Sequence, residues 1–167
     1  VSPSVIAYPC PMPKYVNYDI EFQEFPDEVT LAINLSCCPN GCIGCHSAYL
    51  RGDVGEELTW ERLLALTESY AGTITCVSLM GGDNDPASVL ELLARLKKHY
   101  AGKLKTGWYS GRTWEPSAES LRESLDYLKL GPYLAALGPL NSRDTYQRSY
   151  RVNPIGELED ETFRFWK

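Results

Sequence analysis

Predicted strands alternate with predicted helices along the middle of the chain, and this order constrains the fold more than any other feature of the sequence. Apolar runs predict strands over Val29–Leu35, Thr73–Leu79, Lys103–Tyr109 and Asp126–Leu130. Helical periodicity predicts helices over Leu58–Tyr70, from Asp85-Pro86 to about Tyr100, and over Ser117–Leu125. Strands that alternate with helices favour a parallel sheet with right-handed crossovers, so we expect an α/β fold.

The starts of the first two helices carry recognisable capping residues. Thr59 is expected to cap the first helix, and Asp85 the second, where Pro86 takes the first helical position. The side chains expected to face inward are apolar residues at helical spacing: Leu63, Leu64, Leu66, Val89, Leu90, Leu92, Leu93 and Leu96.

The two ends of the chain have less regular patterns. Residues 1–27 hold five of the 11 prolines and predict an irregular lead-in, with a strand near Tyr15–Phe22. Residues 131–167 form a turn-rich tail in which we expect a strand pair around Tyr146–Val152 and Thr162–Trp166. A chain of 167 residues is long enough to bury one core, so we expect a single domain over 1–167.

Composition argues against two classes of partner. The net charge is −6 and no basic patch is evident, which disfavours binding to a nucleic-acid backbone. No run of about 18 apolar residues occurs, so we expect no membrane span. No signal-peptide pattern is seen, and we expect a cytoplasmic protein.

Three unusual loops follow the first three strands of the expected parallel sheet. They are Cys37–Cys45, Gly81–Asp83 and Tyr109–Gly111. In α/β folds, functional sites lie beyond the carboxyl ends of the parallel strands. We therefore expect these loops to meet at one edge of the sheet and to form the site.

The cysteines favour a metal cluster over a disulfide framework. Four of the six lie between Cys37 and Cys45, too close in sequence to pair readily with one another, so we expect reduced thiols. Cys38, Cys42 and Cys45 have the spacing C-x3-C-x2-C. Three thiolates so placed can hold one side of a [4Fe–4S] cluster and leave one iron open to a further ligand.

Two other interpretations of the same cysteines remain open. A structural zinc site could use Cys38, Cys42, Cys45 and His46, although adjacent residues seldom both reach one tetrahedral ion. A redox-active C-x2-C pair could be formed by Cys42 and Cys45, which would leave Cys38 without a role.

The motifs resemble those of a known group of enzymes. The stretch "CPNGCIGCHS" after the first strand is similar to the cysteine signature of the radical S-adenosylmethionine (SAM) superfamily. "GGD" after the second strand resembles that superfamily's Gly-Gly-Glu motif, with Asp in place of Glu. The short chain and the tail "GPLNSRDTYQRSYRVN" resemble the activating components of anaerobic ribonucleoside-triphosphate reductases.

This resemblance implies a fold and a set of site residues. The fold would be a partial, open parallel β/α barrel of the radical SAM type. Cys38, Cys42 and Cys45 would hold the [4Fe–4S] cluster, whose open iron would chelate SAM. The residues expected to contact SAM are Gly44, Cys45, His46, Gly81, Gly82, Asp83, Tyr109 and Ser110. Of these, Gly81, Gly82 and Asp83 would receive the methionine ammonium through carbonyl oxygens and charge.

The resemblance also implies a reaction and partners. Reductive cleavage of SAM would give a 5′-deoxyadenosyl radical, which would take a hydrogen atom from a glycine of the large reductase subunit. Reduced flavodoxin or a similar protein would supply the electron. Arg143, Gln147, Arg148 and Arg151 in the tail could contact the reductase. The alternatives are an activase of another glycyl-radical enzyme, such as pyruvate formate-lyase, and a non-catalytic iron–sulfur or zinc module.

Overall fold

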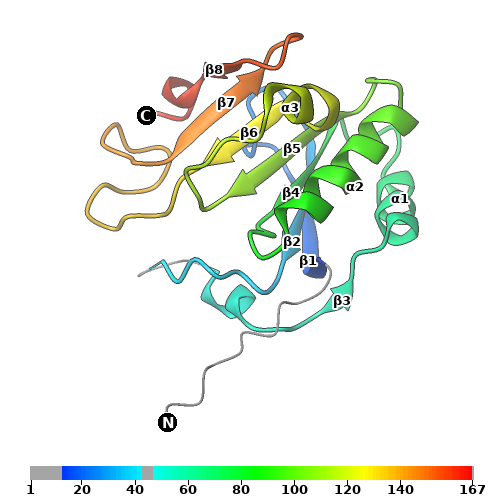
Figure 1. The fold of residues 1–167 in the computed structure, drawn as a ribbon, viewed down its shortest axis with the longest axis horizontal. Coiled ribbons are helices and arrows are strands. Elements are labelled where there is room, and N and C mark those ends of the chain that lie inside the picture. The colour runs from blue at the N-terminus through cyan, green and yellow to red at the C-terminus, as the bar shows by residue number, and fades with distance from the viewer. Residues whose placement is uncertain (1–12, 43–46, 167) are drawn as a thin grey trace.

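The structure, a computed structural model, describes residues 13–42 and 47–166. One sheet carries helices on one of its faces (Figure 1). Its strands are β1 (Lys14–Glu21), β2 (Thr30–Leu35), β3 (Glu56–Glu57), β4 (Cys76–Met80), β5 (Lys105–Ser110), β6 (Tyr127–Leu130), β7 (Arg148–Val152) and β8 (Leu158–Asp160). The helices are α1 (Trp60–Ser69), α2 (Pro86–His99) and α3 (Ala118–Ser124), with 3₁₀ turns η1 (Ala48–Arg51) and η2 (Thr162–Phe165).

The centre of the sheet is parallel, as the alternation of strands and helices predicts. The strand order is β3-β1-β2-β4-β5-β6-β7-β8, in which β2, β4, β5 and β6 are parallel neighbours. β1 and β3 extend one side and β7 and β8 the other, all through antiparallel pairs. The expectation of an α/β fold with an open sheet is confirmed. That this sheet is a partial barrel of the radical SAM type stays a prediction.

The predicted caps are confirmed at both helices. Thr59 Oγ1 accepts a hydrogen bond from the backbone N–H of Arg62 at 3.1 Å. Asp85 Oδ1 accepts from the backbone N–H of Ser88 at 3.3 Å, and Pro86 is the first residue of α2. These bonds satisfy amide groups that have no partner inside the helix.

The main core lies between the three helices and the sheet. Most of the expected inward residues are buried, but Leu64 and Leu90 are only half-buried. Trp108 is the largest fully buried side chain. Its indole Nε1–H donates to the carbonyl oxygen of Gly81 at 2.7 Å and thereby joins β5 to the end of β4.

A second, smaller cluster covers the opposite face at the amino ends of the parallel strands. Phe25, from the β1–β2 connection, stacks on Tyr127 with ring centroids 4.7 Å apart, and Cys76 completes the cluster. Gly107 makes room for Phe25, because a Cβ there would lie 2.4 Å from the ring. Beside it the buried ammonium of Lys129 pairs with Glu24 at 2.6 Å.

One expectation about the chain ends needs correction. β7 pairs with β8, and the expected partner segment Thr162–Trp166 instead contains η2. The reason is a tight reversal just after β7, in which the side-chain oxygen of Asn153 accepts from the amides of Ile155 and Glu157. The strand predicted near Tyr15–Phe22 is confirmed, because β1 covers Lys14–Glu21 and pairs with β2.

Within residues 13–42 and 47–166, no helix is both long and apolar enough to cross a bilayer.

Candidate functional site

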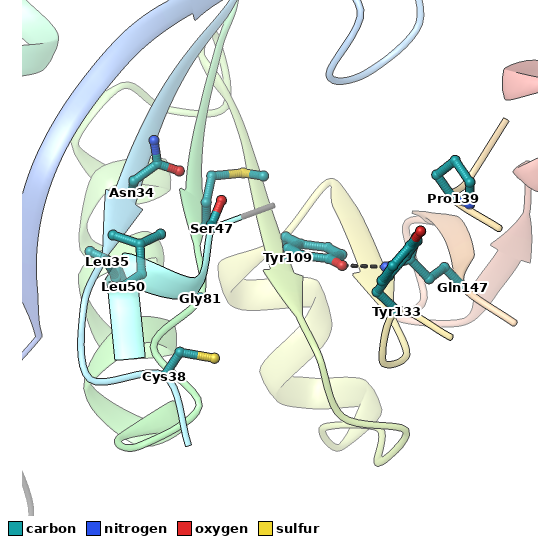
Figure 2. Close-up of a pocket in the computed structure, with 11 residues that line it drawn as sticks. Asn34, Leu35, Cys38, Ser47, Leu50, Gly81, Tyr109, Tyr133, Pro139 and Gln147 are labelled. Atoms are coloured by element: carbon teal, nitrogen blue, oxygen red, sulfur yellow. Dashed lines mark hydrogen bonds between the residues drawn. The ribbon is translucent and has the colours of Figure 1, made fainter. Parts of the chain in front are cut away.

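A cavity of about 240 Å³ lies at the carboxyl ends of β2, β4 and β5 (Figure 2). Its walls come from those strand ends, from the segment around η1 and from the tail after β6. The lining residues are Asn34, Leu35, Cys38, Ser47, Leu50, Met80, Gly81, Tyr109, Tyr133, Pro139 and Gln147. The loops after the three strands therefore meet at one edge of the sheet, where the sequence predicts a site.

Two of the three motif cysteines are described, and both are free. Cys38 lines the cavity and is half-buried, as is Cys42. The backbone N–H of Cys38 donates to the carbonyl of Leu50 at 3.0 Å, and the guanidinium of Arg51 donates to the carbonyl of Cys42 at 2.5 Å. The segment around η1 thus holds both ends of the described part of the cysteine loop.

Cys37 departs from the expectation that the thiols are reduced. It is buried and disulfide-bonded, whereas Cys38, Cys42 and Cys76 are free. Cys37 has a positive φ of 60°, a conformation uncommon for residues other than glycine. Cys37 is thus oxidised, whereas its neighbour Cys38 keeps a free thiol.

The pKa of the Cys38 thiol is subject to opposing influences. Burial raises its pKa, because a thiolate loses hydration there. Hydrogen bonds from Asn40 to the sulfur act in the opposite direction, and the negative charge of Asp83 adds to the increase. The side-chain amide of Asn40 lies 3.5 Å from the sulfur. Hydrogen bonds of this kind stabilise the thiolate form that binds metals.

Asp83 connects the three loops. Its carboxylate is 1% exposed, and Oδ1 accepts from the hydroxyl of Ser110 at 2.5 Å. Oδ2 accepts from the backbone N–H of Gly111 at 2.8 Å and from the side-chain amide of Asn40 at 2.5 Å. One carboxylate therefore joins the end of β4 to the end of β5 and to the cysteine loop.

The two glycines before Asp83 have backbone conformations that suit glycine. Gly81 has φ of +101° and Gly82 has φ of +87°. Gly82 is also crowded, because a Cβ there would lie 2.5 Å from Val89 and 2.9 Å from Leu35. Gly81 lines the cavity, while Gly82 packs against the core beneath it.

Replacing Gly82 with alanine is expected to destabilise the fold by about 2–5 kcal/mol, from the unfavourable φ and from overpacking. Gly72 is the matched control, because it has a similar φ of +85° but a methyl group added there would have no atom within 4 Å. Gly72→Ala should cost about 1–2 kcal/mol. Urea unfolding of both variants measures the difference, and equal losses would show that crowding at Gly82 is unimportant.

The tail supplies a wall of the cavity that the sequence did not reveal. Tyr109, on the face of β5 opposite Trp108, hydrogen-bonds through its hydroxyl to the side-chain amide of Gln147 (Figure 2). Gln147 is buried, so its side chain forms part of the cavity wall rather than of an exposed surface. Thr145, Gln147 and Ser149 are polar yet buried, so apolar patterning gave no signal for them in the sequence.

The tail arginines likewise have partners within the molecule. Arg148 lies 3.8 Å from Asp160, and Arg151 lies 3.3 Å from Glu161. The guanidinium of Arg143 lies over the ring of Trp166 at 5.6 Å.

The remaining predicted site residues divide into two groups. Gly44, Cys45 and His46 lie outside the described residues, so the structure describes no complete cysteine trio. Of the others, Cys38, Gly81 and Tyr109 line the cavity, and Asp83 and Ser110 are buried beside it. Within 13–42 and 47–166, no three His, Cys, Asp or Glu side chains form a group that could hold a metal ion.

Comparison with known proteins adds no relative. No family model, no curated protein and no solved structure matches this chain.

Proposed function

We propose that this chain is a radical SAM activase that generates a glycyl radical on an anaerobic ribonucleoside-triphosphate reductase. The observation that carries the proposal is that Cys38, a free thiol of the C-x3-C-x2-C motif, lines a cavity together with Gly81 and Tyr109. These residues follow or end three adjacent parallel strands, the position at which α/β folds bind ligands. The motif resemblance supplies the reaction class.

The chemistry of the two described motif cysteines supports an iron–sulfur cluster as the group bound here. Thiolates are the ligands that such clusters take, and both Cys38 and Cys42 are free and partly accessible. The amide of Asn40 offers the sulfur of Cys38 the kind of hydrogen bond that tunes cluster potentials. Cys38, Cys42 and Cys45 would hold the cluster. When bound, the cluster would deliver one electron to SAM for reductive cleavage of a C–S bond.

The rest of the cavity suits the organic part of SAM. Leu35, Leu50 and Met80 supply apolar walls that exclude water from a reactive radical. Gly81 lets the ligand approach the backbone closely, and its positive φ is retained without strain. Tyr109 offers an aromatic surface, which its bond to Gln147 holds in place.

The reaction can be tested with the chain and its candidate partner. Anaerobically reconstituted protein is expected to be brown, to contain about four irons per chain, and to release 5′-deoxyadenosine from SAM when reduced. Adding the large subunit of the reductase should produce a glycyl radical detectable by electron paramagnetic resonance. Protein without iron is the control.

Other outcomes identify the alternatives. A colourless protein that holds one zinc and cleaves no SAM would contradict the proposal and support a structural metal module. Cleavage of SAM with a glycyl radical on pyruvate formate-lyase, but none on the reductase, would support a different glycyl-radical target.

A further inference from the structure

The carboxylate of Asp83 accepts three hydrogen bonds, all from neutral donors. A buried carboxylate is costly unless hydrogen bonds replace its lost hydration. Ser110, Gly111 and Asn40 donate three such bonds, and they leave the side chain 1% exposed. The carboxylate is therefore directed toward the β5 end and the cysteine loop, and Asp83 is not among the residues that line the cavity.

Asn40 continues the chain of contacts to the cysteine loop. Its side-chain nitrogen lies 2.5 Å from Asp83 Oδ2 and 3.5 Å from the sulfur of Cys38. Gly111 leaves space for this amide, because a Cβ at position 111 would lie 2.5 Å from the side-chain nitrogen of Asn40. The side-chain amide of Asn40 therefore lies between the carboxylate of Asp83, which accepts its hydrogen bond, and the thiol of Cys38.

We propose that Asp83 is a positioning residue that holds Asn40, and through it Cys38, at the edge of the cavity, rather than a charge contact for the ammonium of SAM. It acts as a hydrogen-bond acceptor, so its negative charge is not what its role requires. The inference rests on the proposed function only in naming Cys38 as a cluster ligand and SAM as the ligand of the cavity.

Asparagine at position 83 separates these two roles. Its side-chain oxygen can replace Oδ2 and accept from Asn40 and Gly111, while its nitrogen donates to the hydroxyl of Ser110. Asp83→Asn therefore keeps the hydrogen bond between position 83 and Asn40, called the tether below, and removes the negative charge. Asp83→Ala removes both, and Asn40→Ala breaks the tether while leaving the charge in place.

The first measurement is hydrogen exchange of the metal-free protein, followed by mass spectrometry for peptides covering residues 36–42. Asp83→Ala and Asn40→Ala are expected to speed exchange in this segment about ten-fold or more, because a buried acceptor or its donor is lost. Asp83→Asn should stay within about two-fold of the parent protein. Ser110→Ala, which removes a donor that does not reach the cysteine loop, should also have a small effect.

The second measurement is SAM binding to the reconstituted protein by calorimetry. Asp83→Asn is expected to keep the dissociation constant within about three-fold, because neither the tether nor a charge contact is lost. A much larger loss of affinity with a normally protected loop would show that the charge binds SAM and would overturn the inference. Unchanged loop exchange in Asn40→Ala, or equal acceleration in Ser110→Ala, would also overturn it.

The two experiments distinguish a failure of the proposed function from a failure of this inference. If the protein takes up no iron and binds no SAM, the proposed function fails, while the exchange data still decide whether Asp83 holds the loop. If Asp83→Ala does not fold, Asn40→Ala carries the same comparison, since it changes a half-buried residue of the loop itself.

Discussion

Replacing Cys38 or Cys42 with alanine is expected to lower iron content sharply and to reduce 5′-deoxyadenosine formation more than about 100-fold. Changes to groups that only surround a metal site cost about 10–100-fold, and loss of a ligand costs more. Both side chains are partly exposed in a loop, so the fold should persist without them. Iron analysis, the absorption spectrum and product assay of the reconstituted variants measure the effect.

Cys76→Ala is the matched control for these variants. Cys76 is also a free cysteine, but it lies fully buried against Phe25 and Tyr127, at the other end of the sheet. Burial and the negative charge of Glu28 raise the pKa of its thiol, which therefore stays protonated and is unsuited to metal binding. Its variant should take up iron normally. Normal iron content and product yield in Cys42→Ala would remove that residue from the ligand set.

Replacing Trp108 with alanine is expected to destabilise the protein by about 3–5 kcal/mol, the usual cost of removing a large buried aromatic side chain. Trp108 is fully buried, and its indole N–H also satisfies the carbonyl of Gly81. For a domain of this size the loss corresponds to a fall in melting temperature of roughly 6–20 °C. Thermal and urea unfolding followed by circular dichroism measure it.

Trp114 provides the comparison. It contacts Trp108 edge to face, with ring centroids 6.2 Å apart, but it is 39% exposed. Trp114→Ala should cost about 1 kcal/mol, the value of an aromatic pair beyond simple burial. Similar losses in both variants would show that the full burial of Trp108 does not make it more important for stability than Trp114.

The parallel centre of the fold could be predicted from the sequence because its signals are local. Strand and helix periods alternate there, and Thr59 and Asp85 mark helix starts by short-range hydrogen bonds. The meeting of the three loops follows from the same pattern, because parallel strands place their carboxyl ends at one edge. No contact between distant segments was needed for either prediction.

The contacts that complete the site depend on distant segments, and they could not be predicted. The bond between Asn40 and Asp83 joins residues 43 positions apart, and that between Tyr109 and Gln147 joins residues 38 apart. Nothing in the composition of either segment identifies its partner. The predicted partner of β7 was wrong for a related reason. A turn at Asn153 and Gly156 determines which segment pairs with β7, and apolar spacing does not.

The small cluster around Phe25 has a consequence for how large molecules approach this chain. Phe25, Tyr127 and the pair formed by Lys129 and Glu24 fill the helix-free face at the amino ends of the strands. Within the described residues that end of the sheet is occupied by side chains, whereas the cavity lies at the carboxyl ends of the strands. A molecule that enters the cavity is therefore expected to approach from the carboxyl ends.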